Sequence, residues 1–308
     1  MSRKYEMLDL NQLKDSVKNK IPLDTYTCMY AARTGQLDCL KFAHENGCEI
    51  DRATCERAAE YGHLDCLKYS FSSNIGFSHF IIMLTVENRH LDCLKFLVEN
   101  NCPWDKSLLN TAASKGDLEC LDYLFSKNIS RDSDVCDSAA RNGHLKCLQF
   151  AVENGCPLTS TTCAKAALNK HLDCLMFARE KGCRFSSRTC ENAIEGGSLE
   201  CFQFAVENGC PWNKEKCLKL AIKHFRISIT SYIKNLIEKE KEKEEKEKDE
   251  KDDESEKIFS TCEICKLNKK CVIFKSCGHV LSCWSCSEKI KNCPRCQEKI
   301  FETLPIFF

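Results

Sequence analysis

A repeat with a fixed period of 27 residues constrains the fold of this chain more than any other feature. Copies of the motif "LDCL", first seen complete at residues 37–40, follow one another without insertion or deletion. The first leucine of the motif recurs at residues 10, 37, 64, 91, 118, 145, 172 and 199. Periods of roughly 20–50 residues are typical of solenoids, in which neighbouring units stack and bury a continuous core. The chain is therefore predicted to fold largely as a repeat array.

Each unit predicts two short helices, for example one over residues 55–61 and a second over residues 64–71. The alanine pair at 58–59 allows close helix contact, and Gly62 ends the first helix. The second helix ends at "ENGC", seen at 45–48, 153–156 and 207–210, where glycine suits the C-terminal cap. Proline with aspartate or asparagine then makes the connection to the next unit.

Cysteine accounts for 26 of the 308 residues, and eighteen of these cysteines occupy three columns of the repeat. The first-helix column, nine residues before the repeat leucine, contains Cys28, Cys55, Ile82, Leu109, Cys136, Cys163, Cys190 and Cys217. The second-helix column, two residues after it, contains Cys39, Cys66, Cys93, Cys120, Cys147, Cys174 and Cys201. The loop column, eleven residues after it, contains Cys48, Ile75, Cys102, Ile129, Cys156, Cys183 and Cys210.

The replacements in two of these columns favour packing over chemistry. Isoleucine or leucine takes the place of cysteine there, which a metal or disulfide site could not accept but a small buried apolar position could. In the second-helix column, Leu64, Leu67 and Tyr69 place Cys66 on the buried face of a helix. We therefore interpret all eighteen as core residues, with redox sensing and adventitious metal binding as the alternatives.

The segment "AARNGHLKCLQFAVENGC" at residues 139–156 resembles the ankyrin repeat in its alanine pair, glycine-histidine-leucine turn, second helix and closing glycine. The resemblance covers residues 10–226 and is closest to the cysteine-rich ankyrin arrays of giant viruses and protists. It implies an all-α solenoid of helix pairs. The usual ankyrin unit has about 33 residues and the "TPLH" opening is absent here, so we expect the β-hairpin between units to be shortened to a loop.

The resemblance also implies a role for the histidine before the repeat leucine, present as His63, His90, His144 and His171. We expect it to bond backbone atoms in the turn rather than to bind a metal. Gln36, Asp117 and Ser198 replace it in other units.

Repeat arrays of this kind present an extended concave surface that binds proteins. The variable first-helix positions are candidates for this surface: Glu56, Arg57, Asn110, Asp137, Lys165 and Glu191. Variable positions can equally be solvated residues without a partner, so both interpretations stay open. The sequence thus predicts an unidentified protein partner on residues 1–230.

Charge and hydropathy argue against two classes of partner. Lysine plus arginine and aspartate plus glutamate both number 45, so the net charge is zero and no basic patch for nucleic acid is visible. No stretch approaches the roughly 18 apolar residues of a membrane helix, and the N-terminus lacks the apolar segment of a signal peptide. We therefore expect a cytoplasmic or nuclear protein, in a compartment that keeps thiols reduced.

Residues 238–254, "EKEKEKEEKEKDEKDDE", are all charged. No residue here can enter a core, and acidic residues interleave with every lysine. Glu242 and Lys246, four residues apart, suit a solvated helix, whereas the composition equally suits a disordered tether. In either form the segment is predicted to separate the array from the cysteine-rich tail.

The tail carries eight potential metal ligands in a fixed order: Cys262, Cys265, Cys277, His279, Cys283, Cys286, Cys293 and Cys296. Each C-x2-C pair can place two thiolates around one ion, and tetrahedral zinc takes four nitrogen or sulfur donors. Eight donors therefore predict two closed structural zinc sites, with no open position for catalysis. Cys271 falls outside the pattern.

This order, with its single histidine in the fourth place, resembles the RING finger, a small α+β domain. In that family the two sites interleave as a cross-brace. The resemblance therefore implies one zinc ion on Cys262, Cys265, Cys283 and Cys286, and a second on Cys277, His279, Cys293 and Cys296. A module this short has little core of its own, and zinc binding, worth about 10 kcal/mol per site, would fold it.

RING fingers are typically ubiquitin ligases without a catalytic nucleophile. They hold a charged ubiquitin-conjugating enzyme where a substrate lysine can attack its thioester, which is catalysis by positioning. Ile264, Val280 and Pro294 match the family's contact positions for that enzyme, with packing around the zinc loops as the alternative. No residue of this chain is therefore expected to be catalytic.

The stretch "SCGHVLSCWSC" and the short spacing are most similar to the C-terminal RINGs of inhibitor-of-apoptosis proteins. Those RINGs form homodimers, and an aromatic residue near the chain end helps to hold ubiquitin. Phe307 has the offset expected for that residue. Gln297 stands where many active RINGs have an arginine that clamps ubiquitin, a departure from the family's pattern.

The sequence as a whole predicts four segments: an ankyrin-like array (1–230), a charged linker (231–258), a RING-type zinc finger (259–300) and a hydrophobic tail (301–308). The function implied is a RING-type ubiquitin-protein transferase that recruits its substrate through the array. The alternative is a non-catalytic adaptor whose RING serves as a zinc-stabilised dimerisation module. Gln297 favours the adaptor, whereas Ile264, Val280, Pro294 and the aromatic tail favour the ligase.

Overall fold

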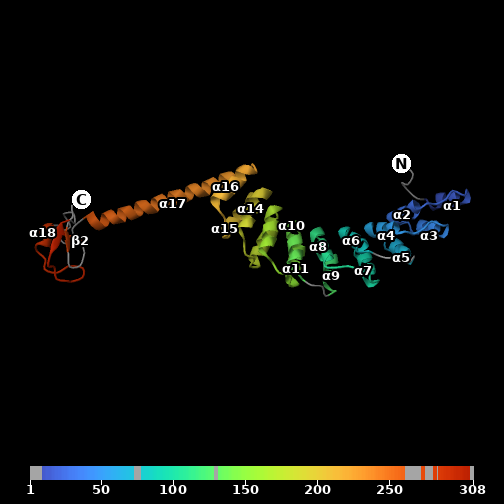
Figure 1. Ribbon diagram of the computed structural model, residues 1–308, viewed down its shortest axis with the longest axis horizontal. Coiled ribbons are helices and arrows are strands. Elements are labelled where there is room, and N and C mark those ends of the chain that lie inside the picture. Colours follow the sequence, from blue (N-terminus) through green and yellow to red (C-terminus); the bar gives the residue numbers. More distant parts are fainter. Residues whose placement is uncertain are drawn as a thin grey trace. The chain divides into compact units, whose positions relative to one another are not determined.

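The computed structural model describes residues 9–72, 78–127, 131–260, 272–274, 280–282 and 284–305. Contacts divide the chain into two compact units, Met1–Ser231 and Tyr232–Phe308. The first unit is a row of short helices that follow one another in sequence order (Figure 1). The fold is thus an ankyrin-repeat solenoid followed by a small C-terminal unit.

The first helices of successive repeats form one layer of the array, and each packs against the first helix of the next repeat. These are α2 (Thr25–Thr34), α4 (Arg52–Glu60), α6 (His79–Glu87), α8 (Ser107–Lys115), α10 (Ser133–Arg141), α12 (Ser160–Leu168), α14 (Ser187–Gly196) and α16 (Lys214–Lys223). The second helices form the other layer: α3 (Leu37–Glu45), α5 (Leu64–Phe71), α7 (Leu91–Glu99), α9 (Leu118–Phe125), α11 (Leu145–Glu153), α13 (Leu172–Glu180) and α15 (Leu199–Glu207).

Caps set where these helices begin and end. The Asp51 carboxylate accepts a hydrogen bond from the Thr54 backbone N–H at 2.9 Å and starts α4 at Arg52, three residues earlier than expected. Gly155, in the expected closing motif, adopts a left-handed backbone with φ of 87° after α11. A side chain disfavours this conformation, which is why glycine recurs there.

All three cysteine columns lie in the core, as the sequence analysis predicted for the residues that the structure describes. Cys28, Cys55 and Cys136 of the first-helix column are completely buried, as is Ile82 in the same column. Cys66 and Cys147 of the second-helix column are each 1% exposed. Two replaced positions of the loop column, residues 75 and 129, lie outside the described residues.

The repeat histidines bond backbone atoms, but those of the preceding unit rather than of their own turn. Nε2 of His63, His90 and His144 lies 2.9–3.1 Å from a carbonyl oxygen 30 residues earlier in the chain. A side chain on Gly62 would overlap the ring of His90, so glycine here makes room for the next unit's histidine. The glycine-histidine pair therefore locks the register between neighbouring repeats.

The array ends differ from its middle. Helix α1 (Leu10–Lys18) packs on α3 and supplies a half unit. At the other end Arg226 takes the histidine's place, and its Nε donates to the Ile194 carbonyl at 3.2 Å. Helix α17 (Ile227–Ser260), orange in Figure 1, starts there and continues through the charged run. Of the two forms considered for that run, a helix or a disordered tether, the structure shows the helix.

The second unit contains a three-stranded antiparallel sheet in the order β2-β1-β3. The strands are β1 (Val272–Phe274), β2 (Val280–Ser282) and β3 (Thr303–Pro305), and a one-turn helix α18 (Trp284–Ser287) follows β2. Ile273 of β1 pairs with Val280 on one side and with Leu304 on the other. These short elements agree with the expected α+β class.

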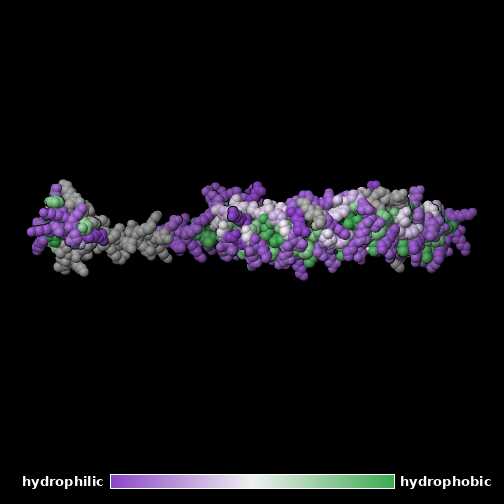
Figure 2. Space-filling view, turned by 90° about the horizontal axis from the view of Figure 1, so that it is seen from below, coloured by the Kyte–Doolittle hydropathy of each residue, from purple (hydrophilic) through white to green (hydrophobic). Residues whose placement is uncertain are grey.

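On the face shown in Figure 2 the array is largely hydrophilic, with hydrophobic residues visible in patches between polar ones. This follows from a two-layer array whose apolar side chains face inward between the helices. Among the helices in the described part of the chain, none combines the length and the apolar character needed to cross a bilayer.

Candidate functional site

The candidate zinc ligands are only partly described. Five of the eight lie outside the described residues: Cys262, Cys265, Cys277, His279 and Cys283. The contact candidates Ile264 and Phe307 also lie outside them, and only the backbone of Val280 is described, in β2. The remaining ligands and contact candidates, Cys286, Cys293, Cys296, Pro294 and Gln297, can be placed in the fold.

Cys293 and Cys296 share one tight turn. The Gln297 N–H donates to the Cys293 carbonyl at 2.9 Å, and the Cys293 N–H donates to the Glu298 carbonyl at 2.8 Å. Asn292 and Lys299 bridge the two arms of the turn as in an antiparallel pair. Cys293 is completely buried while Cys296 is exposed, so the turn presents one thiol to the interior and one to its rim. Two sulfurs held on one such turn suit a tetrahedral zinc ion.

Cys286 stands apart from this turn in the sequence, on the one-turn helix α18, and is half-buried. The expected assignment puts Cys286 on one zinc ion and the Cys293–Cys296 pair on the other. Within the described ranges, no group of three or more histidine, cysteine, aspartate or glutamate residues is placed so that it could hold a metal ion. The thiols of Cys286, Cys293 and Cys296 are donors of the kind that zinc binds. Zinc bound to them would cross-link elements that are too short to hold a core by themselves.

Two residues of the same turn, Pro294 and Gln297, are candidates for contact with a partner protein. Pro294, between the two thiols, is exposed, and its carbonyl accepts a hydrogen bond from Nε2 of Gln297 at 3.3 Å. Gln297 adopts a left-handed backbone with φ of 63°, which reverses the chain after the last ligand. The turn therefore presents a rigid apolar ring and, beside it, a neutral amide.

The repeat cysteines have a different chemical environment. Burial raises the pKa of Cys66 to about 11 and that of Cys174 to about 12, with the nearby Asp65 and Asp173 carboxylates acting in the same direction. The thiolate is the form that binds metals and attacks electrophiles, so these side chains remain neutral thiols at physiological pH. This supports the packing interpretation of the second-helix column.

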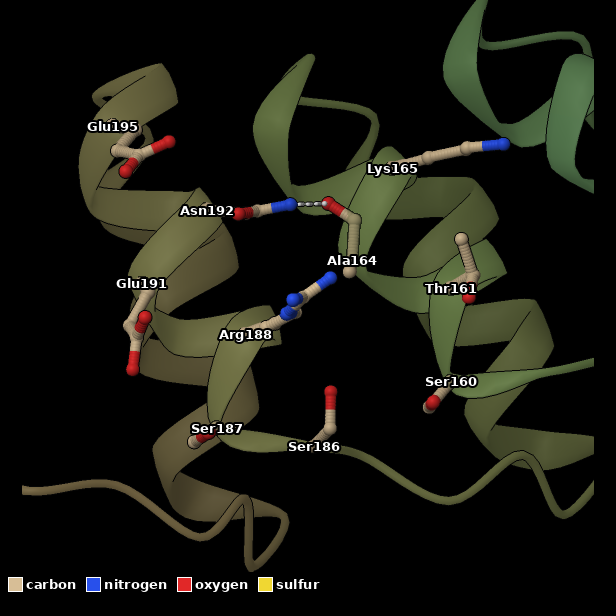
Figure 3. Close-up of a pocket in the computed structure, with 10 residues that line it drawn as sticks. All are labelled: Ser160, Thr161, Ala164, Lys165, Ser186, Ser187, Arg188, Glu191, Asn192 and Glu195. Carbon is tan, nitrogen blue, oxygen red and sulfur yellow. Dashed lines mark hydrogen bonds between the residues drawn. The ribbon is translucent and has the colours of Figure 1, made fainter.

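A pocket of about 720 Å³ opens between α12 and α14 of the array (Figure 3). It is lined by Ser160, Thr161, Ala164, Lys165, Ser186, Ser187, Arg188, Glu191, Asn192 and Glu195. Nδ2 of Asn192 donates to the Ala164 carbonyl at 3.0 Å and ties the two helices together at its upper edge. The sequence analysis named only Lys165 and Glu191 of this lining, because the other residues come together only when α12 and α14 pack side by side.

Two of the four charged residues that line the pocket, Lys165 and Glu191, have ion-pair partners, whereas Arg188 and Glu195 have none among the described residues. Nζ of Lys165 lies 2.9 Å from the Asp137 carboxylate, and Glu191 lies 2.6 Å from Nζ of Lys216. Arg188 is exposed and forms no ion pair with any side chain in the described part of the chain. In Figure 3 its side chain extends from α14 toward α12. Arg188 is thus the cation that this pocket leaves available to a partner.

The expectation for Asp137 as a surface residue is wrong. The side chain is 6% exposed, because Lys165 and Thr162 of the next repeat cover it. The Thr162 hydroxyl donates to one of its oxygens at 2.6 Å. The other candidates, Glu56, Arg57, Asn110, Lys165 and Glu191, are half-buried.

Comparisons with known proteins agree with both parts of the fold. Residues 259–303 match a family model described as "Zinc finger, C3HC4 type (RING finger)". Residues 55–137 match one described as "Ankyrin repeats (3 copies)". The human ASB11 ankyrin repeat domain is similar to this chain with a TM-score of 0.51 and 17% identity, over 60% of this chain and 99% of that domain. That similarity shows the fold.

A curated relative, "Uncharacterized RING finger protein 332L" of Invertebrate iridescent virus 6, is 50% identical over 36 residues. The match spans 12% of this chain and 15% of the relative's length. A RING finger implies zinc binding. The chain carries ankyrin repeats followed by a C-terminal RING finger.

Proposed function

We propose that this protein is a RING-type ubiquitin ligase that recruits a protein substrate through its ankyrin array. The domains are an array over 1–230, a spacer over 231–258, the RING over 259–300 and a tail over 301–308. Two zinc ions on the eight candidate ligands would hold the RING. It would then act by positioning a ubiquitin-conjugating enzyme and its ubiquitin, without a nucleophile of its own. A protein with this chemistry would work in the cytoplasm or nucleus.

The observation that carries the proposal is the turn at Cys293–Cys296. Its hydrogen bonds fix Pro294 in an exposed position between two candidate ligands. An exposed proline on a rigid turn is a preorganised apolar contact, which costs little entropy when a partner binds. Together with Ile264 and Val280, Pro294 supports docking of the conjugating enzyme.

Substrate recruitment is supported by the pocket between α12 and α14. Arg188 lies there, the Ser186 hydroxyl points toward it, and Ser160 and Ser187 also line the pocket. A guanidinium with a neighbouring hydroxyl donor suits a carboxylate on a partner protein. The Arg188→Glu exchange should weaken substrate capture and leave zinc content and autoubiquitination unchanged.

The test of ligase activity is autoubiquitination of the full-length protein with a panel of conjugating enzymes. Pro294→Ala should lower binding of the cognate enzyme about tenfold, or about 1.4 kcal/mol. Arg295→Ala is the matched control, because Arg295 is the next exposed residue of the same turn. Zinc content should be equal in both variants. Absence of activity with every enzyme, together with no effect of Ile264→Ala or Pro294→Ala on binding, would reject the ligase.

Gln297 supports the second candidate, a non-catalytic adaptor with a RING homodimer. Its amide side chain is engaged with the Pro294 carbonyl and carries no charge for ubiquitin. Gln297→Arg distinguishes the two functions: it should raise the rate of ubiquitin transfer if the RING is a ligase. If the RING is an adaptor, the variant should show no transfer, and Phe307→Ala should weaken dimerisation in sedimentation measurements.

A further inference from the structure

Two cysteine columns that the sequence treats separately meet inside each repeat. The first-helix column and the loop column are 20 residues apart in the chain. In the sixth unit the thiol of Cys163, on α12, points at the sulfur of Cys183, in the loop after α13, and the two sulfurs are 2.9 Å apart. Both residues are thiols in the structure. We propose that Cys163 and Cys183 form a peroxide-responsive dithiol, which closes to a disulfide on oxidation.

The same two columns also interact in other units, where side-chain contacts join Cys28 to Cys48, Cys136 to Cys156 and Cys190 to Cys210. The thiols of Cys28 and Cys136 lie 3.8 and 3.9 Å from the carbonyl oxygens of Cys48 and Cys156. At Cys163 the distance from sulfur to sulfur is 2.9 Å. A disulfide bond is about 2.05 Å long, so a small movement of the loop brings the two atoms to bonding distance.

The two thiols have distinct roles in the reaction. The hydrogen bond from Cys163 lowers the pKa of Cys183, whereas the same bond and burial raise the pKa of Cys163. Cys183 is also the less buried of the two, at 5% exposed against 0%. Because the thiolate is the reactive form, Cys183 is the residue that peroxide oxidises first and Cys163 is the resolving thiol.

The steps balance with hydrogen peroxide as the oxidant. The Cys183 thiolate attacks one peroxide oxygen, the O–O bond breaks, and Cys183 sulfenic acid and hydroxide form. The Cys163 sulfur then attacks the sulfenic sulfur. The S–S bond forms, the S–O bond breaks, and the hydroxyl leaves with the Cys163 proton as water. Hydroxide takes up the proton that Cys183 first released, so two thiols and one peroxide give one disulfide and two waters.

Oxidation would alter the start of α12. The Cys183 thiol donates to the Thr159 carbonyl at 3.0 Å, and Thr159 caps α12. A disulfide removes that donor and ties α12 to the loop after α13. Ser160 and Lys165 of the same helix line the pocket between α12 and α14, so the dithiol would place this pocket under redox control. The proposal does not require ligase activity. A low-molecular-weight thiol would reopen the bond by exchange.

Cys102 is a matched control within the chain. It occupies the same loop column as Cys183 and is similarly buried, at 3% exposed. The first-helix column of its unit holds Ile82 instead of cysteine. Cys102 therefore shares the position of Cys183 but has no resolving thiol at the equivalent place. The Cys163→Ile variant recreates this natural combination and should fold, because the array already accommodates Ile82.

The test treats the zinc-loaded full-length protein with increasing hydrogen peroxide, blocks the remaining thiols and maps tryptic peptides by mass spectrometry. Peptide 147–165 should become linked to peptide 182–184, and a thiol reductant should reverse the link. The Cys183 thiol should be lost roughly tenfold faster than the Cys102 thiol. Since peptide 147–165 also contains Cys147 and Cys156, Cys163→Ile identifies the partner and should abolish the link. Equal loss of the Cys183 and Cys102 thiols, or a link that persists in Cys163→Ile, would overturn the proposal.

Discussion

Cys66 of the array and Cys293 of the C-terminal unit are almost equally buried, at 1% and 0% exposed, yet their surroundings differ. Cys66 sits on an eight-residue helix within a row of stacked pairs. Cys293 sits on a turn in the part of the chain after α17, where the described elements are three-residue strands and a four-residue helix. Burial alone therefore does not distinguish a packing cysteine from a candidate zinc ligand. The size of the surrounding core and the C-x2-C spacing do.

The largest expected effect comes from removing zinc from the intact protein. A strong chelator should unfold the C-terminal unit, because about 10 kcal/mol per site of binding energy is lost there. The array should keep its helical signal, since its core consists of stacked side chains. Far-UV circular dichroism and limited proteolysis read out the two units separately. Loss of protection in residues 9–226 along with the RING would mean that the repeat cysteines also depend on metal.

The next effect in size is expected at Asp137, which links α10 to α12. Asp137→Ala leaves Lys165 without its counter-ion and Thr162 without an acceptor. Removing one partner of a fully buried pair costs about 3–5 kcal/mol, and because Lys165 is 35% exposed we expect about 2 kcal/mol here. Urea unfolding of the full chain measures it. Lys219→Ala is the control, because the Lys219–Glu215 pair is exposed on both sides and should change little.

The helices of the array could be predicted because the same residue pattern recurs in each repeat. The second helix expected over 64–71 is observed as Leu64–Phe71. The first helix was expected three residues late because the Asp51 cap was not recognised, although an aspartate three residues before a threonine was visible in the sequence. The candidate zinc ligands could also be identified from the sequence, because their spacing along the chain defines the pattern.

Contacts between distant residues could not be predicted from the period alone. Asp137 is buried because Lys165 and Thr162 of the following repeat cover it. The sequence of one repeat taken alone does not contain these two residues. The contact of Cys163 with Cys183 likewise depends on how the loop after α13 returns to α12. Arg226 substitutes for the repeat histidine despite a different chemistry, because its length lets it reach the Ile194 carbonyl.

A smaller effect should separate two glycines that share the left-handed conformation. A Cβ at Gly62 would lie 2.5 Å from Nδ1 of His90, whereas nothing lies within 4 Å of one at Gly155. Gly155→Ala should cost about 1 kcal/mol through backbone strain alone. Gly62→Ala should cost about 2 kcal/mol, because the ring must also move away from the Glu60 carbonyl. Thermal unfolding compares the two, and equal costs would show that the glycine-histidine contact contributes nothing to the register.

The smallest effect, and the one that bears most directly on the two kinds of cysteine, is expected for Cys66→Ala. Removing one buried sulfur should cost about 1 kcal/mol, since the small cavity that remains can partly close. Zinc content should not change, and autoubiquitination should stay at the level of the unmodified protein. Cys293→Ala is the matched variant: the same exchange at an equally buried thiol should lower zinc content and unfold the C-terminal unit. If Cys66→Ala also lowered zinc content, the distinction between packing thiols and ligands would fail at its best-defined position.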